Sequence, residues 1–259
     1  MLPVPDLPRT RVCAVSYLNT VPLVWGMLHG PQRDAFDLSF SVPSECADRV
    51  SSGAADIGII PCVELLRQDL KMVPGLGIVS RGPVRSILLI SKKPLSEVRT
   101  LAGDVSSRTS VALTRIVLAR RYGALPEVVS RPPDLARMLE AADAALIIGD
   151  PALRLDPAGL PWAVHDMGAE WTGLTGLPMV FAVWAGRSDA VTEDAARVFH
   201  ESYSYGRSHL EEIIRQESES RGLPPELARE YLTRRIVFEV GDAERKGLER
   251  FLEYARELA

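Results

Sequence analysis

The sequence is poor in the residues that build disulfide and metal sites. Its 259 residues include three cysteines, Cys13, Cys46 and Cys62, which are widely spaced and form no CxxC pair. An odd number of scattered cysteines argues against a disulfide framework and is typical of buried thiols in a reducing compartment. The four histidines show no spacing typical of metal ligands. We therefore expect no metal site and no cofactor.

The chain also lacks an excess of basic residues and any long apolar run. Its 30 lysines and arginines and 34 aspartates and glutamates give a net charge of −4, which argues against a nucleic acid or an anionic membrane as partner. No run approaches the roughly 18 apolar residues of a membrane span. The proline-rich residues 1–10 contain no apolar signal-peptide core. We therefore expect a cytoplasmic protein, whereas its oligomeric state does not follow from these patterns.

Short apolar runs alternate with helical patterns over most of the chain. The first strands are predicted over residues 11–15, 36–42, 56–60, 72–80 and 84–91, and the helices between them over 21–28, 43–53 and 63–68. This alternation at short spacing predicts an α/β protein with a doubly wound parallel sheet. Residues from about 92 to 177 repeat the pattern as a second unit. A long apolar strand over 178–185 follows, and the chain beyond residue 189 is mostly helical.

One stretch, Asp104–Ser110, is rich in hydroxyl groups and leads directly into an apolar helical run. Its hydroxyl side chains are those of Ser106, Ser107, Thr109 and Ser110. Either Ser106 or Ser107 is the expected N-cap, because its oxygen can accept a hydrogen bond from an amide two or three residues on. The first turn would offer free N–H groups and contains no acidic residue, which is typical of an anion site. A helix cap without a ligand is the alternative.

A second polar cluster follows the first predicted strand. Tyr17, Asn19 and Thr20 lie between this strand and the next helix. Ligands of open α/β sheets bind at the carboxyl ends of strands, so these side chains are candidates for binding a ligand. Asn19 as a simple helix cap is the alternative.

The two long apolar strands over 84–91 and 178–185 bracket the second α/β unit. If the backbone crosses between lobes at these strands, residues 1–88 and 181–259 form lobe one, and residues 89–180 form an inserted lobe two. A ligand would then bind in the cleft between the lobes, and hinge closure would be the natural motion. Asn19 and Ser44 would face Ser107, Thr109 and the turn at Gly149-Asp150 across the cleft.

Five short motifs occur in an order and spacing that resemble a known family. They are SYLNTVPL (16–23), DIGIIP (56–61), VRSI (84–87), DVSSRTS (104–110) and LIIGD (146–150). Together they resemble the chorismate dehydratases of the futalosine route to menaquinone (the MqnA family). The resemblance implies a two-lobed fold of the type II periplasmic-binding-protein kind, in agreement with the lobes inferred above.

The activity that this resemblance implies is dehydration of chorismate, a dianion, to 3-[(1-carboxyvinyl)oxy]benzoate and water. In the family the substrate is thought to assist its own reaction: its enolpyruvyl carboxylate removes a ring proton, and the ring hydroxyl then leaves. The five motifs contain no Cys–His pair, Glu–His pair or metal set that would supply a protein base. They are rich in neutral donors, which suits the binding of a dianion.

By matching positions, the resemblance assigns Asn19 and Ser86 to catalysis. They would bind the reacting carboxylate and orient the leaving hydroxyl. The substrate-binding residues it implies are the hydroxyls of the helix start, with two neighbours after the first strand: Ser106, Ser107, Thr109, Ser110, Tyr17 and Thr20.

Three charged residues in the motifs have open roles. Arg85 or Arg108 could pair with a substrate carboxylate in a bidentate way, and a solvated surface charge is the alternative for both. Asp150 lies at a strand end and could act as an acid, or it could cap the next helix.

Two other functions compete with the lyase. A solute-binding protein for a small anionic ligand would share the fold, since fold alone does not determine function, but it should carry an export signal or a lipid-anchor cysteine. The 1,4-dihydroxy-6-naphthoate synthase of the same pathway also shares the fold. It would place a histidine in the cleft, and no histidine of this chain falls in a motif.

Overall fold

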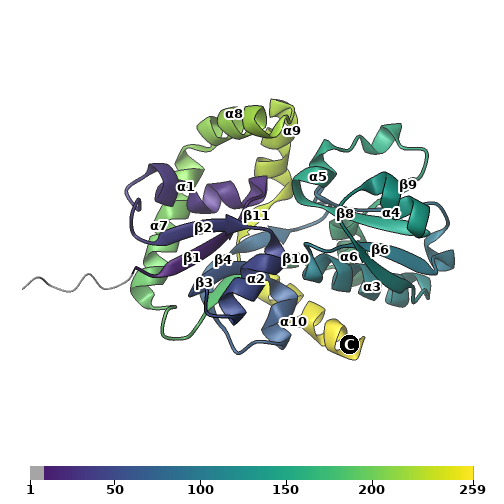
Figure 1. The fold of residues 1–259 in the computed structure, drawn as a ribbon, viewed down its shortest axis with the longest axis horizontal. Coiled ribbons are helices and arrows are strands. Elements are labelled where there is room, and N and C mark those ends of the chain that lie inside the picture. The colour runs from purple at the N-terminus through teal and green to yellow at the C-terminus, as the bar shows by residue number, and fades with distance from the viewer. Residues whose placement is uncertain (1–8, 259) are drawn as a thin grey trace, which may run out of the picture.

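The computed structural model describes residues 9–258, which form two mixed sheets, each flanked by helices (Figure 1). The prediction that residues 1–10 contain no signal-peptide core concerns mostly residues 1–8, which lie outside the described residues. None of the described helices is long and apolar enough to cross a membrane.

The first sheet has the strand order β11-β4-β10-β3-β1-β2. Its strands are β1 (Arg11–Val15), β2 (Asp37–Ser41), β3 (Ile57–Pro61), β4 (Lys71–Ser80), β10 (Met179–Gly186) and β11 (Val237–Glu239). β1 is parallel to β2 and β3, as predicted, whereas β10 is antiparallel to β3 and β4. The prediction of a parallel sheet is therefore wrong for its other half, because β10 returns from the second sheet and enters from the opposite end.

The second sheet has the order β7-β6-β8-β5-β9. Its strands are β5 (Ile87–Ser91), β6 (Thr100–Asp104), β7 (Glu127–Arg131), β8 (Ala144–Ile148) and β9 (Ala163–Asp166). β6 is parallel to β7 and β8, and β5 is antiparallel to β8 and β9. β6 lies between the strand predicted over 84–91 and the stretch Asp104–Ser110, where no strand is predicted. Its Leu-Ala-Gly centre lacks the β-branched residues that are typical of a strand.

The backbone crosses between the sheets twice, after β4 and before β10. The predicted strand over 84–91 is too long at its start. Arg85 has a φ of +69°, and the N–H groups of Val84 and Arg85 donate to the Asp166 carboxylate at 2.9 and 2.6 Å. The strand therefore begins only at Ile87. The lobe boundaries near residues 88 and 181 stay a prediction.

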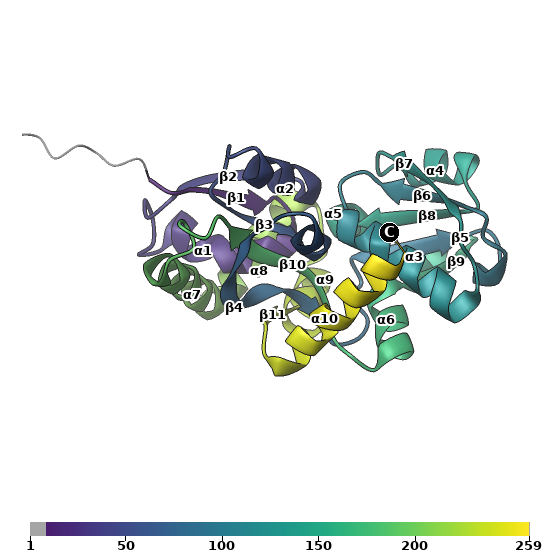
Figure 2. The same ribbon diagram turned by 90° about the horizontal axis from the view of Figure 1, so that it is seen from below.

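The helices cover both sheets and join them. They are α1 (Val21–His29), α2 (Pro43–Ser51), α3 (Arg108–Tyr122), α4 (Leu135–Ala141), α5 (Gly149–Arg154), α6 (Met167–Thr175), α7 (Glu193–Ser208), α8 (Leu210–Arg221), α9 (Pro225–Glu230) and α10 (Asp242–Glu257). The helix predicted over 63–68 is a short 3-10 helix at Cys62–Leu66. α10 packs against β10 of the first sheet and α3 beside the second (Figure 2).

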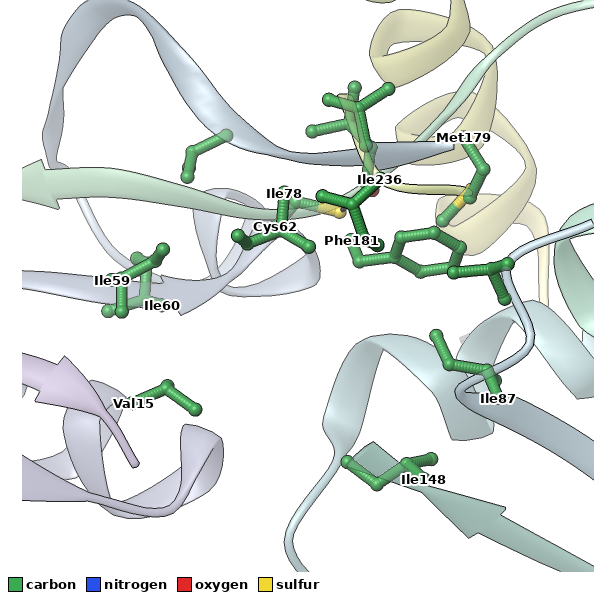
Figure 3. Packing of buried hydrophobic residues seen from close by; sticks show 14 of the residues in the cluster. Val15, Ile59, Ile60, Cys62, Ile78, Ile87, Ile148, Met179, Phe181 and Ile236 are labelled. Carbon is green, nitrogen blue, oxygen red and sulfur yellow. Dashed lines mark hydrogen bonds between the residues drawn. The ribbon is translucent and has the colours of Figure 1, made fainter. Parts of the chain in front are cut away.

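Apolar side chains from both sheets meet where the backbone crosses between them (Figure 3). Phe181 on β10 and Ile59 on β3 belong to the same buried cluster as Ile87 and Ile148 of the second sheet. Burial of each such side chain contributes about 1.5–3 kcal/mol to folding. The cluster therefore holds the strand ends of the two sheets close together.

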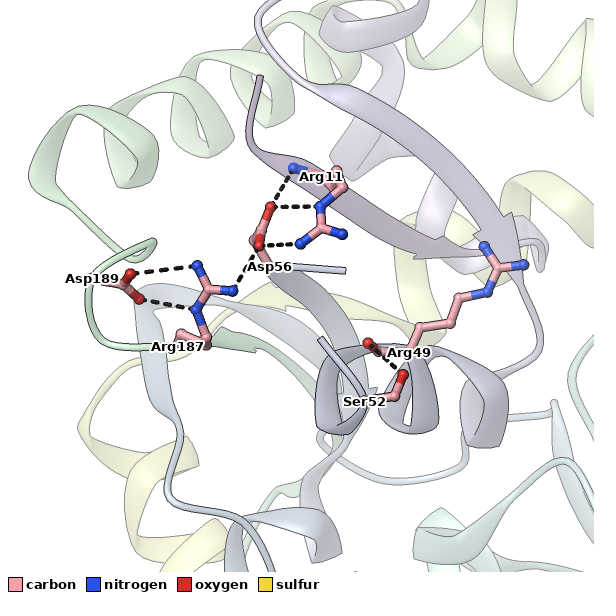
Figure 4. Close-up of polar contacts among 6 residues, drawn as sticks. All are labelled: Arg11, Arg49, Ser52, Asp56, Arg187 and Asp189. Carbon is pink, nitrogen blue, oxygen red and sulfur yellow. Dashed lines mark hydrogen bonds and ion pairs between the residues drawn. The ribbon is translucent and has the colours of Figure 1, made fainter. Parts of the chain in front are cut away.

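Ion pairs stabilise the opposite end of the first sheet, where the strands β1 and β3 start. Asp56 accepts hydrogen bonds from Arg11 at 2.7 Å and from Arg187 at 3.0 Å, and Arg187 also pairs with Asp189 (Figure 4). The Arg11 guanidinium holds the pKa of Asp56 below its ordinary value. Asp56 comes directly before β3, so this network holds the strand starts of the sheet, away from the cluster at the strand ends.

Candidate active site

A cavity lies between the two sheets, and a water-sized sphere has about 60 Å³ of space in it. In this arrangement of the sheets the site is therefore narrower than the roughly 300–1,000 Å³ of typical small-molecule pockets. Strand ends and the turns after them supply its walls. It is lined by Val15, Tyr17, Asn19, Thr20, Pro43, Ile59, Pro61, Ile78, Val84, Ser86, Ile87, Ser107, Thr109, Ser110, Ile148, Gly149, Phe181 and Ala182. Several of the apolar lining residues belong to the cluster in Figure 3. The site thus combines an apolar floor with a few polar groups.

Most of the predicted site residues line this cavity. Those that do are Tyr17, Asn19, Thr20, Ser86, Ser107, Thr109 and Ser110. Ser106, Arg85 and Asp150 lie outside the lining, as does Ser44, whose neighbour Pro43 is part of the wall. Among the described lining residues none carries a charged side chain. The polar groups of the cavity are therefore hydroxyls, one amide and backbone N–H groups.

Asn19 lies in a short 3-10 turn, Leu18–Thr20, between β1 and α1. Its side chain caps neither this turn nor α1, so the alternative of a simple helix cap is wrong. Its Nδ2 donates to the Tyr231 hydroxyl at 3.0 Å, and its Oδ1 accepts from the Thr20 hydroxyl at 3.4 Å. Both hydrogen bonds fix the orientation of the amide beside the cavity.

Ser86 lies just before β5, at one crossing between the sheets. Its Oγ accepts a hydrogen bond from the Tyr231 hydroxyl at 2.8 Å, and its carbonyl accepts from Gly149 N–H at 2.8 Å. Tyr231, which joins Ser86 to Asn19, is absent from the sequence-based prediction. It lies among the apolar residues of a helical stretch, so its pattern is that of a core position and carries no signal of a site.

The hydroxyl-rich stretch forms the start of α3. Ser107 is the N-cap, and its Oγ accepts from Ser110 N–H at 3.3 Å. No acidic residue lies in the first turn, and among the described residues neither the Ser107 nor the Ser110 hydroxyl donates a hydrogen bond to the protein. Both can donate to a ligand in the cavity. The predicted N-cap is confirmed, and the turn has the donors of an anion site.

The hydroxyl groups of Ser106 and Thr109, at the same turn, form hydrogen bonds within the protein. The Ser106 hydroxyl donates to Asp104 at 2.7 Å, and burial raises the pKa of Asp104. The Thr109 hydroxyl oxygen accepts from Val63 N–H at 3.3 Å. Ser106 therefore supports the cavity wall from behind, and Thr109 ties α3 to the first sheet.

Tyr17 reaches from the first sheet to the second. Its hydroxyl lies 3.2 Å from Ser106 Oγ, and its ring packs against Gly149, where a Cβ would lie 2.6 Å from the ring. Burial raises the pKa of Tyr17 to about 12, so its phenol stays neutral at physiological pH. Tyr17 closes one end of the cavity.

Arg85 neither faces the cavity nor points into solvent. Its guanidinium donates to the carbonyl oxygens of Ala152 at 2.9 Å and Leu155 at 2.6 Å, at the end of α5. The left-handed backbone at Arg85 turns the side chain toward these carbonyls. It binds the unpaired carbonyls of a helix end. Arg85 is therefore neither a partner for a substrate carboxylate nor a solvated surface charge.

Arg108 and Asp150 form contacts between the two sheets. Arg108 pairs with Asp48 at 2.7 Å and with Glu64 at 3.3 Å. Asp150 accepts from Leu18 N–H at 3.0 Å and pairs with Arg221. Ile148, not Asp150, occupies the N-cap of α5. Asp150 is therefore neither a helix cap nor part of the cavity lining, and it links α5 to α8.

Among residues 9–258 no group of three or more metal-ligating side chains occurs. The described chain nonetheless holds a partly open, mostly apolar cavity lined by several neutral donors. This arrangement can bind and orient a small anion and stabilise charge that moves within it.

Comparison with known proteins shows which family the chain resembles. A family model described as "Menaquinone biosynthesis" matches residues 10–257. The chain is 29% identical over 255 residues to a protein of Thermus thermophilus named "Chorismate dehydratase", with 92% of each chain covered.

Solved structures show the fold. Protein AF1704 from Archaeoglobus fulgidus matches with a TM-score of 0.75 and 18% identity, covering 96% of this chain and 97% of that one. The alkanesulfonate-binding protein SsuA from Xanthomonas axonopodis pv. citri matches with a TM-score of 0.68 and 17% identity, covering 96% and 93%. The Candida albicans CA3427 product, described as having the generic periplasmic binding protein fold, matches at 0.63 and 15%, covering 98% and 92%. The predicted two-lobed fold is confirmed.

Proposed function

We propose, from the premise that the chain belongs to the menaquinone biosynthesis family, that it is a chorismate dehydratase. It would convert chorismate to 3-[(1-carboxyvinyl)oxy]benzoate and water, in the futalosine route to menaquinone and in the cytoplasm. The observation that carries the proposal is the cavity between the sheets. Its polar groups are uncharged donors, and they include Asn19 and Ser86, the two residues that the family motifs assign to catalysis.

The proposed reaction needs positioning more than a protein base. The enolpyruvyl carboxylate takes a proton from the ring carbon beside it, and the electron pair of that C–H bond becomes part of the ring. The bond between the neighbouring ring carbon and its hydroxyl oxygen breaks. The departing hydroxyl takes the proton back from the enolpyruvyl carboxyl group and leaves as water. The ring becomes aromatic, and both carboxylates stay on the product.

Each polar group of the cavity has a place in this reaction. Asn19 and Ser86 would bind the enolpyruvyl carboxylate and the departing hydroxyl, where charge moves during the elimination. Ser107, Ser110 and the free N–H groups of α3 would hold the ring carboxylate, because a helix start favours negative charge. The apolar floor would exclude water, which strengthens these hydrogen bonds.

Turnover of chorismate tests this proposal directly. Purified protein is incubated with chorismate, and the product is followed by chromatography and mass spectrometry. We expect a product that is lighter than chorismate by one water and has a benzoate-like absorbance. No turnover, together with tight binding of another small anion, would instead identify a solute-binding protein. The naphthoate synthase alternative is less well supported, because no histidine is among the described residues that line the cavity.

Substitutions at the two assigned residues test the site itself. Asn19→Ala and Ser86→Ala should each lower kcat by about 100-fold or more, the usual effect of removing a donor to developing charge. Circular dichroism should show that both variants stay folded. Ser52→Ala is the matched control, because its hydroxyl bonds only the carbonyl of Arg49 on the surface (Figure 4). Full activity in either site variant would remove that residue from the site.

A further inference from the structure

The Tyr231 hydroxyl lies between the two residues assigned to catalysis. It donates to Ser86 Oγ at 2.8 Å and accepts from Asn19 Nδ2 at 3.0 Å. Only 1% of Tyr231 is exposed, and it does not line the cavity. Residues 19, 86 and 231 are distant in the sequence, so only the fold brings this chain of hydrogen bonds together.

The backbone around Tyr231 has an unusual conformation. α9 ends at Glu230, and residues Tyr231–Arg235 form a single π turn, in which Ile236 N–H donates to the Tyr231 carbonyl at 3.1 Å. Single π turns within helices are rare and frequently occur at functional sites. Here the turn carries a buried phenol to the edge of the cavity.

Counting hydrogens gives the direction of this chain. The Asn19 amide donates to the Tyr231 oxygen, and the single Tyr231 hydrogen is donated to Ser86 Oγ. The Ser86 oxygen is thereby an acceptor on its buried side, and its own hydrogen remains available. Since Ser86 lines the cavity, that hydrogen can be donated to a ligand there.

We propose that Tyr231 is a positioning residue for the elimination, which fixes Asn19 relative to Ser86 and directs the Ser86 hydroxyl hydrogen into the cavity. This inference rests on the proposed function. Without Tyr231 the Ser86 hydroxyl would rotate freely and the Asn19 amide would lose one of its two fixed partners. Tyr231 acts through these two side chains and does not itself reach the substrate.

The state of the phenol fits this role. Burial raises the pKa of Tyr231 well above its ordinary value, so the phenol stays protonated and continues to donate at neutral and mildly alkaline pH. The carboxylates of Asp150 and Asp166 also raise the pKa of Tyr231. A phenolate has no hydrogen to donate, so the Ser86 hydroxyl would donate to it and would have no hydrogen left for a ligand.

The substitution Tyr231→Phe removes only the hydroxyl oxygen. We expect kcat to fall about 10- to 100-fold, the range for loss of one group that orders catalytic donors, while KM changes less than about twofold. The matched control is Tyr122→Phe, whose hydroxyl bonds Glu170 at 2.8 Å, outside the cavity. Tyr122→Phe should keep wild-type kcat.

A double substitution separates positioning from a general structural effect. In a Ser86→Ala background, Tyr231→Phe should lower the residual kcat much less than it does in the wild type, because its effect passes largely through Ser86. Equal losses in both backgrounds would show that the effect of Tyr231 does not pass through Ser86, which would overturn the inference. In the wild type, NMR should detect the Tyr231 hydroxyl proton as slowly exchanging; a rapidly exchanging proton would overturn the inference even if Tyr231→Phe fails to fold.

The outcomes separate the inference from the proposed function. Wild-type turnover of chorismate with full activity in Tyr231→Phe would overturn the inference and leave the function standing. A wild-type protein that does not turn over chorismate would contradict the function and, with it, this role of Tyr231.

Discussion

Gly149 joins the end of β8 to the first turn of α5 through a left-handed backbone conformation. Its φ is +64°, and a Cβ at this position would lie 2.6 Å from the ring of Tyr17. Glycine is therefore needed twice, for the turn and for the close approach of the aromatic ring. The sequence marks the residue as a turn but contains no sign of the ring that packs on it.

Gly149→Ala should weaken both folding and turnover. The left-handed conformation costs a residue with a Cβ about 1–2 kcal/mol, and the Tyr17 ring must move away from the cavity wall. We expect a lower free energy of unfolding in urea and a kcat/KM reduced about tenfold or more.

Gly123→Ala provides the control for Gly149→Ala. Gly123 has a φ of +66°, and a Cβ there would meet no neighbouring group of the described chain within 4 Å, so the substitution carries the same backbone cost without the aromatic contact. Only the loss of stability and of kcat/KM that Gly149→Ala shows beyond Gly123→Ala reports on the contact with Tyr17. Equal activity in the two variants would show that the ring contact has no part in catalysis.

Among the elements, the start of β8 anchors the loop between β5 and β6. The Asp143 carboxylate accepts from Arg99 N–H at 2.9 Å and Thr100 N–H at 3.2 Å, and pairs with Lys93 at 2.7 Å. The Lys93 hydrogen bond and these backbone donors lower the pKa of Asp143 from 3.8 to about 2. β6 is held in place by this contact, which the sequence pattern did not indicate.

Asp143→Asn should make folding less stable at neutral pH but not at strongly acidic pH. A lowered pKa in the folded state stabilises the protein above the ordinary value of 3.8, and this stabilisation is lost as the pH falls toward about 2. After discounting for solvent, we expect a loss of about 1 kcal/mol at pH 7. Urea unfolding of both proteins between pH 2 and pH 7 measures the difference.

The exposed Asp69 supplies the comparison, since Asp69→Asn should change the free energy of unfolding by less than about 0.5 kcal/mol at any pH. A loss in Asp143→Asn that does not shrink toward pH 2 would contradict the assigned ion pair and hydrogen bonds.

At the scale of the whole molecule, polar contacts close the cavity from two sides. Arg221 of α8 pairs with Asp150 of α5 and donates to the Ser16 carbonyl at 2.8 Å. On another side, Arg108 of α3 pairs with Asp48 and Glu64. The ion pairs of Arg221 and of Arg108 each join an element beside one sheet to an element beside the other. We expect them to stabilise a closed arrangement of the two sheets, since proteins of the periplasmic-binding-protein fold close around ligands by hinge motion.

Arg221→Gln should favour opening of the cavity. Loss of the ion pair removes a contact that exists only when the two sheets are close, so we expect KM for chorismate to rise about tenfold, equivalent to about 1.4 kcal/mol, with a smaller change in kcat. Small-angle X-ray scattering should show a larger radius of gyration without substrate.

Arg229→Gln is the matched control for this variant, because Arg229 pairs with Glu211 and that pair joins α9 to α8 without reaching the second sheet. It should keep the wild-type KM. An unchanged KM and radius of gyration in Arg221→Gln would argue against closure through this ion pair.

Much of the local structure could be predicted from residue patterns. β1 begins and ends where the pattern places it, and Ser107 caps α3, because strand periodicity and capping depend on neighbouring residues. The predictions fail where contacts between distant residues determine the structure. β10 runs antiparallel, and the strand predicted over 84–91 begins only at Ile87.

The sequence by itself determined most of the order of elements, the hydroxyl-rich start of α3 and the lack of a Cys–His or Glu–His pair in the five motifs, because these are local patterns. Only the tertiary structure decided which groups meet. It placed Tyr231 between Asn19 and Ser86, turned Arg85 toward the end of α5, and paired Asp150 with Arg221. Such contacts depend on distances between residues far apart in the chain, and burial removes the competing water that would otherwise make them weak.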